Sequence, residues 1–333
     1  SFRLHGDLDL VCQRPVVVQA ALNTATDDDA LQAMCLVTGE QAPVERLHAS
    51  IKGVWGAQTS GANIVSFNAR AFESYGKTER QGENAPVSRA AAFAYTTALN
   101  HLLRKDSPQR IQVGDASTVF WAERQDPFET IFGDIFQDNP DSSTDKVEAL
   151  LNAVHSGHWG PMDKDLRYHV LGLAPNAARI SIRFYHCVTL QELGQRIAQH
   201  FEDLALVRGP NDARYPSLFR LLTAVALQNK ADNIPPNLGG AVVDAILAGP
   251  GVPYPSLWLN AVVGRCRAEQ TVNHLRAAAI KACLNRQQRH AALSSPSTAP
   301  EKEFLPMLDL SNTNPAYRLG RLFAVLEKIQ EEA

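Results

Sequence analysis

Residues 56–63, which read GAQTSGAN, contain two glycines with four residues between them, a spacing that resembles a phosphate-binding motif. A P-loop ends in Gly-Lys-Ser/Thr, because its lysine contacts the outer phosphates and its hydroxyl contacts Mg²⁺. Here Ala62 and Asn63 follow the second glycine. The stretch also precedes the apolar run at 64–67, whereas a P-loop follows its strand and opens a helix. The sequence therefore argues against a nucleoside-triphosphate site and leaves the purpose of this loop open.

Two other groupings are candidates for catalysis. His155 and His158 have the spacing of a metal-binding pair, but no third ligand lies at a matching distance, which favours an ordinary surface loop. Cys35 and His48 could form a nucleophile and a base, although such a cysteine is more often a small buried apolar residue. The sequence has no G-x-S-x-G, H-E-x-x-H or strand-linked G-x-G-x-x-G motif. We therefore expect no enzymatic activity, no catalytic or metal-binding residues and no cofactor.

Residues 56–84 suit binding better than catalysis, because small polar, amide and basic side chains are dense there. Glycine N–H groups, side-chain amides and the cations of Lys or Arg contact nucleic-acid backbones and base edges. The candidates in and just before this segment are Lys52, Gln58, Thr59, Ser60, Asn63, Asn68, Arg70, Tyr75 and Lys77. The alternative interpretation is a turn-rich surface loop that folds back on its own sheet.

Further basic residues could contact phosphates. Alternation over residues 179–184 predicts a strand with Arg179, Ser181 and Arg183 on one exposed face and apolar residues on the other. Between Trp258 and Leu293 the single acid, Glu269, is outnumbered by basic residues, which predicts a local cationic patch. These are Arg265, Arg267, Arg276, Lys281, Arg286 and Arg289, followed in the last predicted helix by Arg318 and Arg321. The alternative in each case is a solvated face with ion pairs.

Composition sets broad limits. The chain has 333 residues, which suffices for two domains or for one large domain with an appendage. Its formal charge of -3 gives no whole-chain support for nucleic-acid binding, so that case rests on local clusters. Five cysteines without a C-x-x-C pair indicate neither a disulfide framework nor a zinc ribbon, and they fit a reducing cytoplasm. The chain begins at Ser1 and stops inside a predicted helix, so we expect a segment of a longer polypeptide.

The expected fold class is α+β, with a mixed strand and helix N-terminal part followed by an all-α helical bundle. Strands are predicted at residues 64–67, 118–122, 168–174 and 179–186, from their branched and aromatic content. Helices are predicted at 88–104 (with Ser88 as N-cap), 216–228, 238–247, 255–265, 271–293 and 315–333.

A capping box at Thr189 and Glu192 predicts one further helix, whose buried stripe contains Leu190, Leu193, Ile197, Phe201 and Leu204. Residues 137–144 predict a polar loop and 294–300 a linker. The expected domains are 1–188, an α+β nucleic-acid-contacting domain, 189–293, a helical domain, and 294–333, a linker and the start of a truncated C-terminal bundle.

The run at 56–103, GAQTSGANIVSFNARAFESYGKTERQGENAPVSRAAAFAYTTALNHLL, resembles the large subunit of the type I-C CRISPR Cascade complex. Other runs agree in order: CLVTGEQAPVERLH from Cys35, STVFWA from Ser117, HVLGLAPNAARISIRFYH from His169 and NPAYRLGRLFAVLEKIQ from Asn314. The resemblance extends over most of the chain, although residues 126–165 contribute nothing to it.

The resemblance implies a non-enzymatic subunit of an RNA-guided antiviral surveillance complex. Such subunits contact the guide crRNA near its 5′ handle and the protospacer-adjacent motif (PAM) of double-stranded target DNA. They support R-loop formation, bind the displaced single strand, associate with backbone, handle-binding and small Cascade subunits, and recruit the helicase-nuclease. Family members are longer than this chain, so part of the PAM-reading apparatus is expected outside it. Met307 lies about where an internal start for a small subunit would fall.

Two other functions stay open at this point. One is a nuclease of the same defence system, which needs clustered carboxylates or histidines that the sequence does not show convincingly. The other is a structural scaffold without direct DNA contacts, whose basic residues serve protein partners only. Steep salt dependence of DNA affinity would separate a DNA-contacting subunit from the scaffold.

Overall fold

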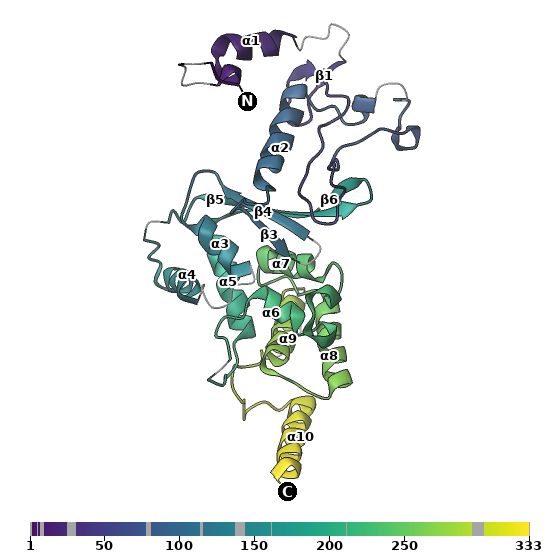
Figure 1. Cartoon of the computed structure of the whole chain (residues 1–333). Coiled ribbons are helices and arrows are strands. Elements are labelled where there is room, and N and C mark those ends of the chain that lie inside the picture. Colours follow the sequence, from purple (N-terminus) through teal and green to yellow (C-terminus); the bar gives the residue numbers. More distant parts are fainter. Residues whose placement is uncertain are drawn as a thin grey trace. The chain divides into compact units, whose positions relative to one another are not determined.

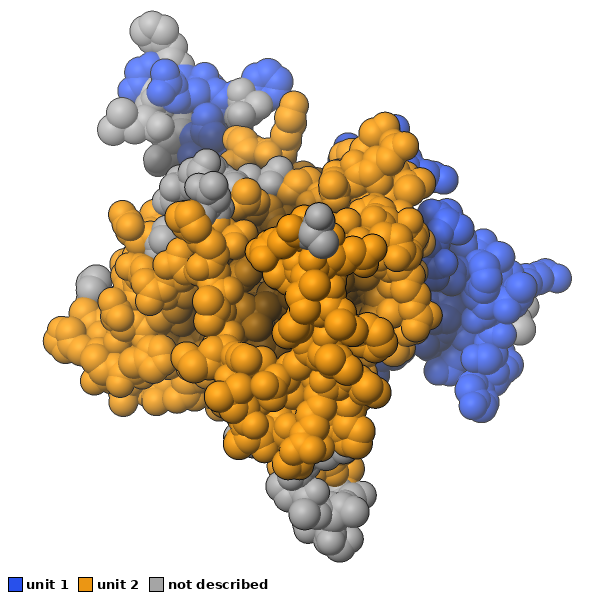
Figure 2. All heavy atoms as spheres, turned by 90° about the horizontal axis from the view of Figure 1, so that it is seen from below, with its two compact units in different colours: residues 1–53, 57–104, 175–181 blue, residues 54–56, 105–174, 182–333 orange. Residues whose placement is uncertain are grey.

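The computed structural model describes residues 2–4, 6, 10–24, 31–77, 81–113, 116–136, 144–160, 162–210, 212–294 and 303–332 (Figure 1). Helices and strands are both present, which confirms the expected mixed α+β class. The chain forms two compact units, blue and orange in Figure 2. Unit 1 contains residues 1–53, 57–104 and 175–181, and unit 2 contains residues 54–56, 105–174 and 182–333. The domains expected from the sequence stay predictions.

Unit 1 is built around helix α2 (Arg89–Leu102). The Ser88 hydroxyl accepts a hydrogen bond from the Ala91 N–H, which confirms the predicted N-cap. A small core of Cys35, Val87 and Ala92 packs beside it. The remaining elements are η1 (Val11–Gln13), α1 (Pro15–Thr24), the antiparallel strands β1 (Gln32–Met34) and β2 (Gln41–Pro43), η2 (Arg70–Phe72) and η3 (Gln81–Asn84).

The strand predicted at residues 64–67 is wrong. Pairing nearby is limited to isolated bridges, Ile51 with Ala62 and Asn63 with Arg179, and residues 64–67 themselves form bends and irregular backbone. All four are half-buried. Their branched and aromatic content therefore reflects packing against the unit and not strand pairing, which β-propensity alone does not distinguish.

Unit 2 contains most of a sheet in the order β3 (Arg110–Val113), β4 (Ala116–Ala122), β5 (Arg167–Asn176) and β6 (Arg179–Thr189). Strand β4 pairs antiparallel with both β3 and β5, which confirms the predicted strands there. Phe120, Tyr168 and Phe184 point into the main core from one face of the sheet. Gly172 is required on β5 because a Cβ atom there would overlap the Phe184 ring.

Helices complete unit 2 (Figure 1). One apolar core joins most of them to the sheet, whereas the last helix has no buried residue. They are α3 (Phe128–Phe136), α4 (Thr144–Ser156), α5 (Leu190–Leu204), α6 (Leu218–Thr223), η4 (Leu227–Asn229), η5 (Ala231–Asn233), α7 (Leu238–Ala248), α8 (Ser256–Glu269), α9 (His274–Ser294) and α10 (Pro315–Glu332). The Thr189 capping box and the buried stripe of α5 are confirmed. None of the described helices has the length and apolarity that a bilayer span requires.

The helix predicted at 216–228 is shorter in the structure, because α6 ends at Thr223. Gln228 and Asn229 have φ of 57° and 52°, a left-handed conformation that a right-handed helix does not accept. The polar loop predicted at 137–144 and the linker predicted at 294–300 lie outside the described residues, apart from Thr144 in α4 and Ser294 in α9.

Candidate nucleic-acid interface

The glycine-rich stretch that resembles a P-loop is a tight turn in unit 1. The Gly61 N–H donates to the Gln58 carbonyl at 2.9 Å. Gly61 has φ of +97°, and a Cβ atom there would lie 2.9 Å from the Ile51 carbonyl oxygen, so the position needs glycine. The side chains of Gln58, Thr59 and Ser60 are exposed as a result. The turn thus presents an amide and two hydroxyls to solvent.

Asn63 serves the architecture of unit 1. Its Nδ2 donates to the His48 carbonyl at 2.6 Å, and its backbone carbonyl accepts the Ile180 N–H at 2.9 Å. The side chain is half-buried. These bonds fasten the end of the turn to strand β6, so an Asn63 substitution would disturb the fold as well as any ligand contact.

A second turn presents Tyr75. The Lys77 N–H donates to the Ser74 carbonyl at 3.1 Å, and the central residues Tyr75 and Gly76 have φ of 57° and 74°. Positive φ at both positions defines a type I′ turn, and a non-glycine residue there costs roughly 1 kcal/mol. The Asn84 side chain fixes the turn, accepting the Ser74 N–H and donating to the Lys77 carbonyl, each at 3.1 Å. The Tyr75 side chain is 96% exposed, so a strained and braced turn projects an aromatic ring into solvent.

Three cations and an amide complete this surface of unit 1. Lys52, Asn68, Arg70 and Lys77 are exposed, and Lys77 Nζ donates to the Glu83 carbonyl at 3.0 Å. We call residues 52 and 57–77 the polar loop. It contains exposed cations that suit phosphates, exposed amides and hydroxyls that suit polar base edges, and one exposed aromatic ring.

The strand face predicted from Arg179, Ser181 and Arg183 is not uniformly exposed. Arg179 lies 3.9 Å above the Phe72 ring as a cation–π pair, and both it and Ser181 are half-buried. Arg183 is exposed and donates to Asn237 Oδ1 at 3.0 Å. The expectation of one open cationic face is therefore wrong at its first two residues, because Arg179 packs on an aromatic ring.

The cationic patch predicted on α9 is also wrong as a surface feature. Arg276, Lys281 and Arg286 are 2%, 7% and 0% exposed. Arg276 pairs with Glu269, and its guanidinium donates to the carbonyls of Ala224 and Thr271 at 3.0 and 3.1 Å. Its charge is thus balanced inside the unit, which leaves it no route to a phosphate.

Lys281 and Arg286 bind the C-terminal end of α5. Lys281 Nζ donates to the Asp203 carbonyl at 2.8 Å, where the partial negative charge of a helix end favours a cation. Burial lowers the pKa of Lys281. Arg286 Nε donates to Asp203 Oδ2 at 2.9 Å and Nη1 to the Ala245 carbonyl at 2.7 Å. Arg289 reaches the other Asp203 oxygen at 2.8 Å, so Asp203 joins two arginines beneath the surface.

The other predicted cations of unit 2 lie nearer the solvent. Arg265 is half-buried and forms a 3.6 Å ion pair with Glu269, while Arg267 is exposed at the end of α8. On α10, Arg318 is exposed and Arg321 is half-buried. These positions are at least partly accessible, and they lie on two separate helices, α8 and α10.

Sequence reasoning missed a row of rings on the sheet of unit 2. Trp121 on β4 lies opposite His169 on β5, with ring centroids 5.0 Å apart and planes within 9° of parallel. Tyr185 on β6 follows at 6.1 Å and 19°. We call these three residues the aromatic row. A usable signal existed, since Phe120 is buried in the core and the alternation of a strand then directs Trp121 to the opposite face.

The catalytic candidates do not assemble. Across the described part of the chain, no three His, Cys, Asp or Glu side chains gather as metal ligands. His155 Nδ1 lies 2.7 Å from the Leu151 carbonyl oxygen. Hydrogen bonds from Ser88 lower the pKa of Cys35 to about 6, but the thiol is buried. His48 bonds instead to the Tyr95 hydroxyl at 2.6 Å, and burial lowers its pKa.

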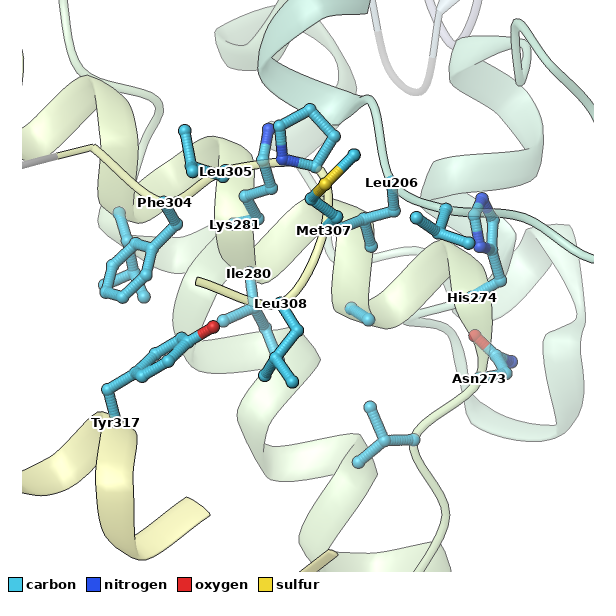
Figure 3. Close-up of a pocket in the computed structure, with 15 residues that line it drawn as sticks. Leu206, Asn273, His274, Ile280, Lys281, Phe304, Leu305, Met307, Leu308 and Tyr317 are labelled. Carbon is cyan, nitrogen blue, oxygen red and sulfur yellow. The ribbon is translucent and has the colours of Figure 1, made fainter. Parts of the chain in front are cut away.

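A cavity of about 840 Å³ lies between α9 and residues 304–308 (Figure 3). Its lining is mostly aliphatic and aromatic, with Ile280 and Met307 among the residues that face it. The Lys281 ammonium on its wall is already bound by the Asp203 carbonyl. The Val207 N–H holds the outer segment through the Pro306 carbonyl at 2.9 Å. The cavity is therefore mostly apolar, with Asn273, His274 and Tyr317 as its other polar lining residues.

Comparison with known families identifies a match over the whole chain. The family model described as CRISPR-associated protein (Cas_Csd1) matches residues 1–333, which includes both units. No curated protein matches this sequence. The family match agrees with the resemblance to the large subunit of a type I-C Cascade, which the run at 56–103 and the other runs in the same order indicate.

Proposed function

Because the chain belongs to the Csd1 family of CRISPR-associated proteins, we propose that it is the non-catalytic large subunit of an RNA-guided antiviral surveillance complex. In this role the subunit contacts PAM-proximal duplex DNA and the 5′ handle of the guide RNA, supports R-loop formation and recruits the helicase-nuclease. Base pairing with the guide recognises the long target sequence, so protein groups need to recognise only a short duplex motif.

The observation that carries the proposal is the polar loop. Its Gln58–Ser60 turn presents hydrogen-bonding groups that suit base edges, and its Lys52, Arg70 and Lys77 suit phosphates. Tyr75 adds an aromatic ring that a strained turn exposes to solvent. This ring is not part of the core of unit 1. Such a surface needs neither a nucleophile nor a metal to perform recognition.

The test is target binding by the assembled complex, guide included, on duplexes with and without the PAM. The informative variant is Gln58→Ala with Thr59→Ala and Ser60→Ala. Its matched control is Gln41→Ala with Thr97→Ala, which removes an exposed amide from β2 and an exposed hydroxyl from α2 in the same unit. We expect the loop variant to lose discrimination between the two duplexes and the control to keep it. Discrimination equal to wild type, at matched thermal stability, would reject PAM reading by this turn.

Salt dependence separates the proposal from a scaffold that makes no DNA contacts. Each phosphate that a protein cation neutralises releases counterions and steepens the fall of affinity with salt. We therefore expect Arg70→Gln to weaken binding to both duplexes alike and to reduce the slope of log K against log[salt] by about 1. An unchanged slope would favour the scaffold, and Mg²⁺-dependent cleavage of DNA by the complex without its helicase-nuclease would favour a nuclease.

A further inference from the structure

The aromatic row stands on the face of the sheet that turns away from the helical core. Phe120, Tyr168 and Phe184 fill that core from the opposite face. Trp121, His169 and Tyr185 alternate with them in sequence and are exposed to differing degrees, Trp121 and His169 being half-buried and Tyr185 53% exposed. The row is thus an addition to the packing of unit 2, whose core already contains an aromatic cluster.

The three rings of the row, one from each of three neighbouring strands, are stacked with nearly parallel planes. The Trp121 and His169 planes differ by 9° and the His169 and Tyr185 planes by 19°. His169 Nδ1 lies 2.9 Å from the Tyr185 hydroxyl, which fixes the orientation of the outermost ring. Cross-strand aromatic pairs stabilise a sheet by only about 0.2–1 kcal/mol each, so the sheet alone gives little reason to expose a tyrosine this far.

The charges around the row differ at its two ends. Arg183 lies two residues before Tyr185 on β6, on the same side of the strand, and its side chain is exposed. At the Trp121 end, Glu123 is exposed just past the end of β4, and the exposed Arg167 of β5 lies opposite it, since the Glu123 N–H donates to the Arg167 carbonyl. An anionic strand would therefore meet a cation beside Tyr185 and charges of both signs beyond Trp121, which favours its phosphates at the Arg183 end.

We propose that the aromatic row is a stacking platform for unpaired nucleotides, with bases on the Tyr185 end of the row and a phosphate at Arg183. Sheets that bind single strands combine exposed rings for base stacking with nearby cations for the backbone, and duplexes do not offer free base faces to such a surface. The inference rests on the proposed function only for the source of the strand, which is either displaced DNA or guide RNA.

The test uses the full chain and the assembled complex with single-stranded DNA and RNA oligonucleotides that contain 2-aminopurine, whose fluorescence falls on stacking. The key variant is Tyr185→Thr, which removes the ring and retains a residue that favours strands. Tyr185→Phe keeps the ring. Ile182→Thr is the matched control, because it removes an equally exposed apolar side chain from the same strand at a position of opposite parity.

We expect Tyr185→Thr to weaken single-strand affinity by about fivefold or more and to abolish the 2-aminopurine quenching, since one base–aromatic stack contributes that much. Tyr185→Phe and Ile182→Thr should retain both signals. A larger loss on DNA identifies the displaced strand as the source, and a larger loss on RNA identifies the guide. Wild-type affinity and quenching in Tyr185→Thr, or equal losses in Ile182→Thr, would overturn the proposal.

Failure of this proposal and failure of the proposed function are distinguishable. PAM discrimination on duplex targets reports on the Gln58–Ser60 turn, and Tyr185→Thr is expected to leave it unchanged. Single-strand quenching reports on the aromatic row, and the turn variant is expected to leave that unchanged.

Discussion

The polar loop of unit 1 and helix α9 of unit 2 are both rich in cations, yet the structure uses their charges in opposite ways. Arg70 and Lys77 in the loop are exposed, while Arg276, Lys281 and Arg286 on α9 are buried. The α9 cations bind carboxylates and carbonyls of α5, α7 and α8, and the loop cations remain open to solvent. The comparison teaches that cationic residues signal an interface only when the fold leaves them without internal counter-charges.

Removing a buried cation should have the largest effect on stability. Arg286→Ala should lower the free energy of unfolding by about 3 kcal/mol or more, because it leaves the buried Asp203 carboxylate partly uncompensated. All four tryptophans lie in unit 2, so their fluorescence during urea denaturation reports on that unit. The exposed Arg267→Ala on α8 is the control, with an expected change within about 0.5 kcal/mol. If the two variants were equally stable, the distinction between buried and exposed cations would be wrong.

A second test uses pH to probe the same interior. Burial, with Arg286 beside it, lowers the pKa of His200 to about 3, and the ring bonds to the Tyr254 hydroxyl at 2.6 Å. The unfolded chain binds a proton near the ordinary pKa of about 6.5, so the unfolded state gains protons first as the pH falls. Unit 2 should therefore lose up to about 1.4 kcal/mol of stability per pH unit between about pH 6.5 and pH 3 from this group.

Comparing urea denaturation of wild type and His200→Gln at pH 7 and pH 5 checks this expectation. The variant should show a smaller difference between the two pH values than wild type. His158→Gln, which alters an exposed histidine, should follow wild type. A pH dependence unaltered by His200→Gln would mean that water reaches this site, and the contrast with the polar loop would weaken.

The same contrast explains what the sequence could and could not reveal. Strands β4, β5 and β6 and the capped helix α5 were predictable, because branched and aromatic content and helix caps are local signals. The burial of Arg286 was not, because its partner Asp203 lies 83 residues away and only the fold brings them together. The strand predicted at residues 64–67 was wrong for the same reason, because a strand forms only where the fold supplies a partner strand.

For the candidate site, the high density of polar and basic residues in the polar loop could be recognised in the sequence. The structure shows that most of them are exposed. The role of Asn63 in fastening the loop and the left-handed turn at Tyr75 needed coordinates. The aromatic row could have been found, because Phe120 and Trp121 are adjacent in a strand and only one of them can face the core.

The substitution with the smallest expected effect on stability tests whether the strained turn at Tyr75 exists to present its ring. Tyr75→Gly should raise the stability of unit 1 by about 1 kcal/mol, because glycine adopts positive φ without the clash of a Cβ atom. If the ring contacts nucleic acid, the same change should weaken target binding by the complex about fivefold or more. Hydrogen exchange at the α2 amides measures the first effect and duplex binding the second.

Ala177→Gly provides the matched control, since Ala177 is also a non-glycine residue at positive φ, 53°, in unit 1, and it has no side chain suited to stacking. It should gain stability and leave binding unchanged. Opposite signs for stability and binding in Tyr75→Gly, beside this control, would show that the strained turn exists to present the ring. A gain in stability with unchanged binding in both variants would make the turn a feature of folding alone, and the polar loop would then depend on its amide, hydroxyl and basic groups for any contact with DNA.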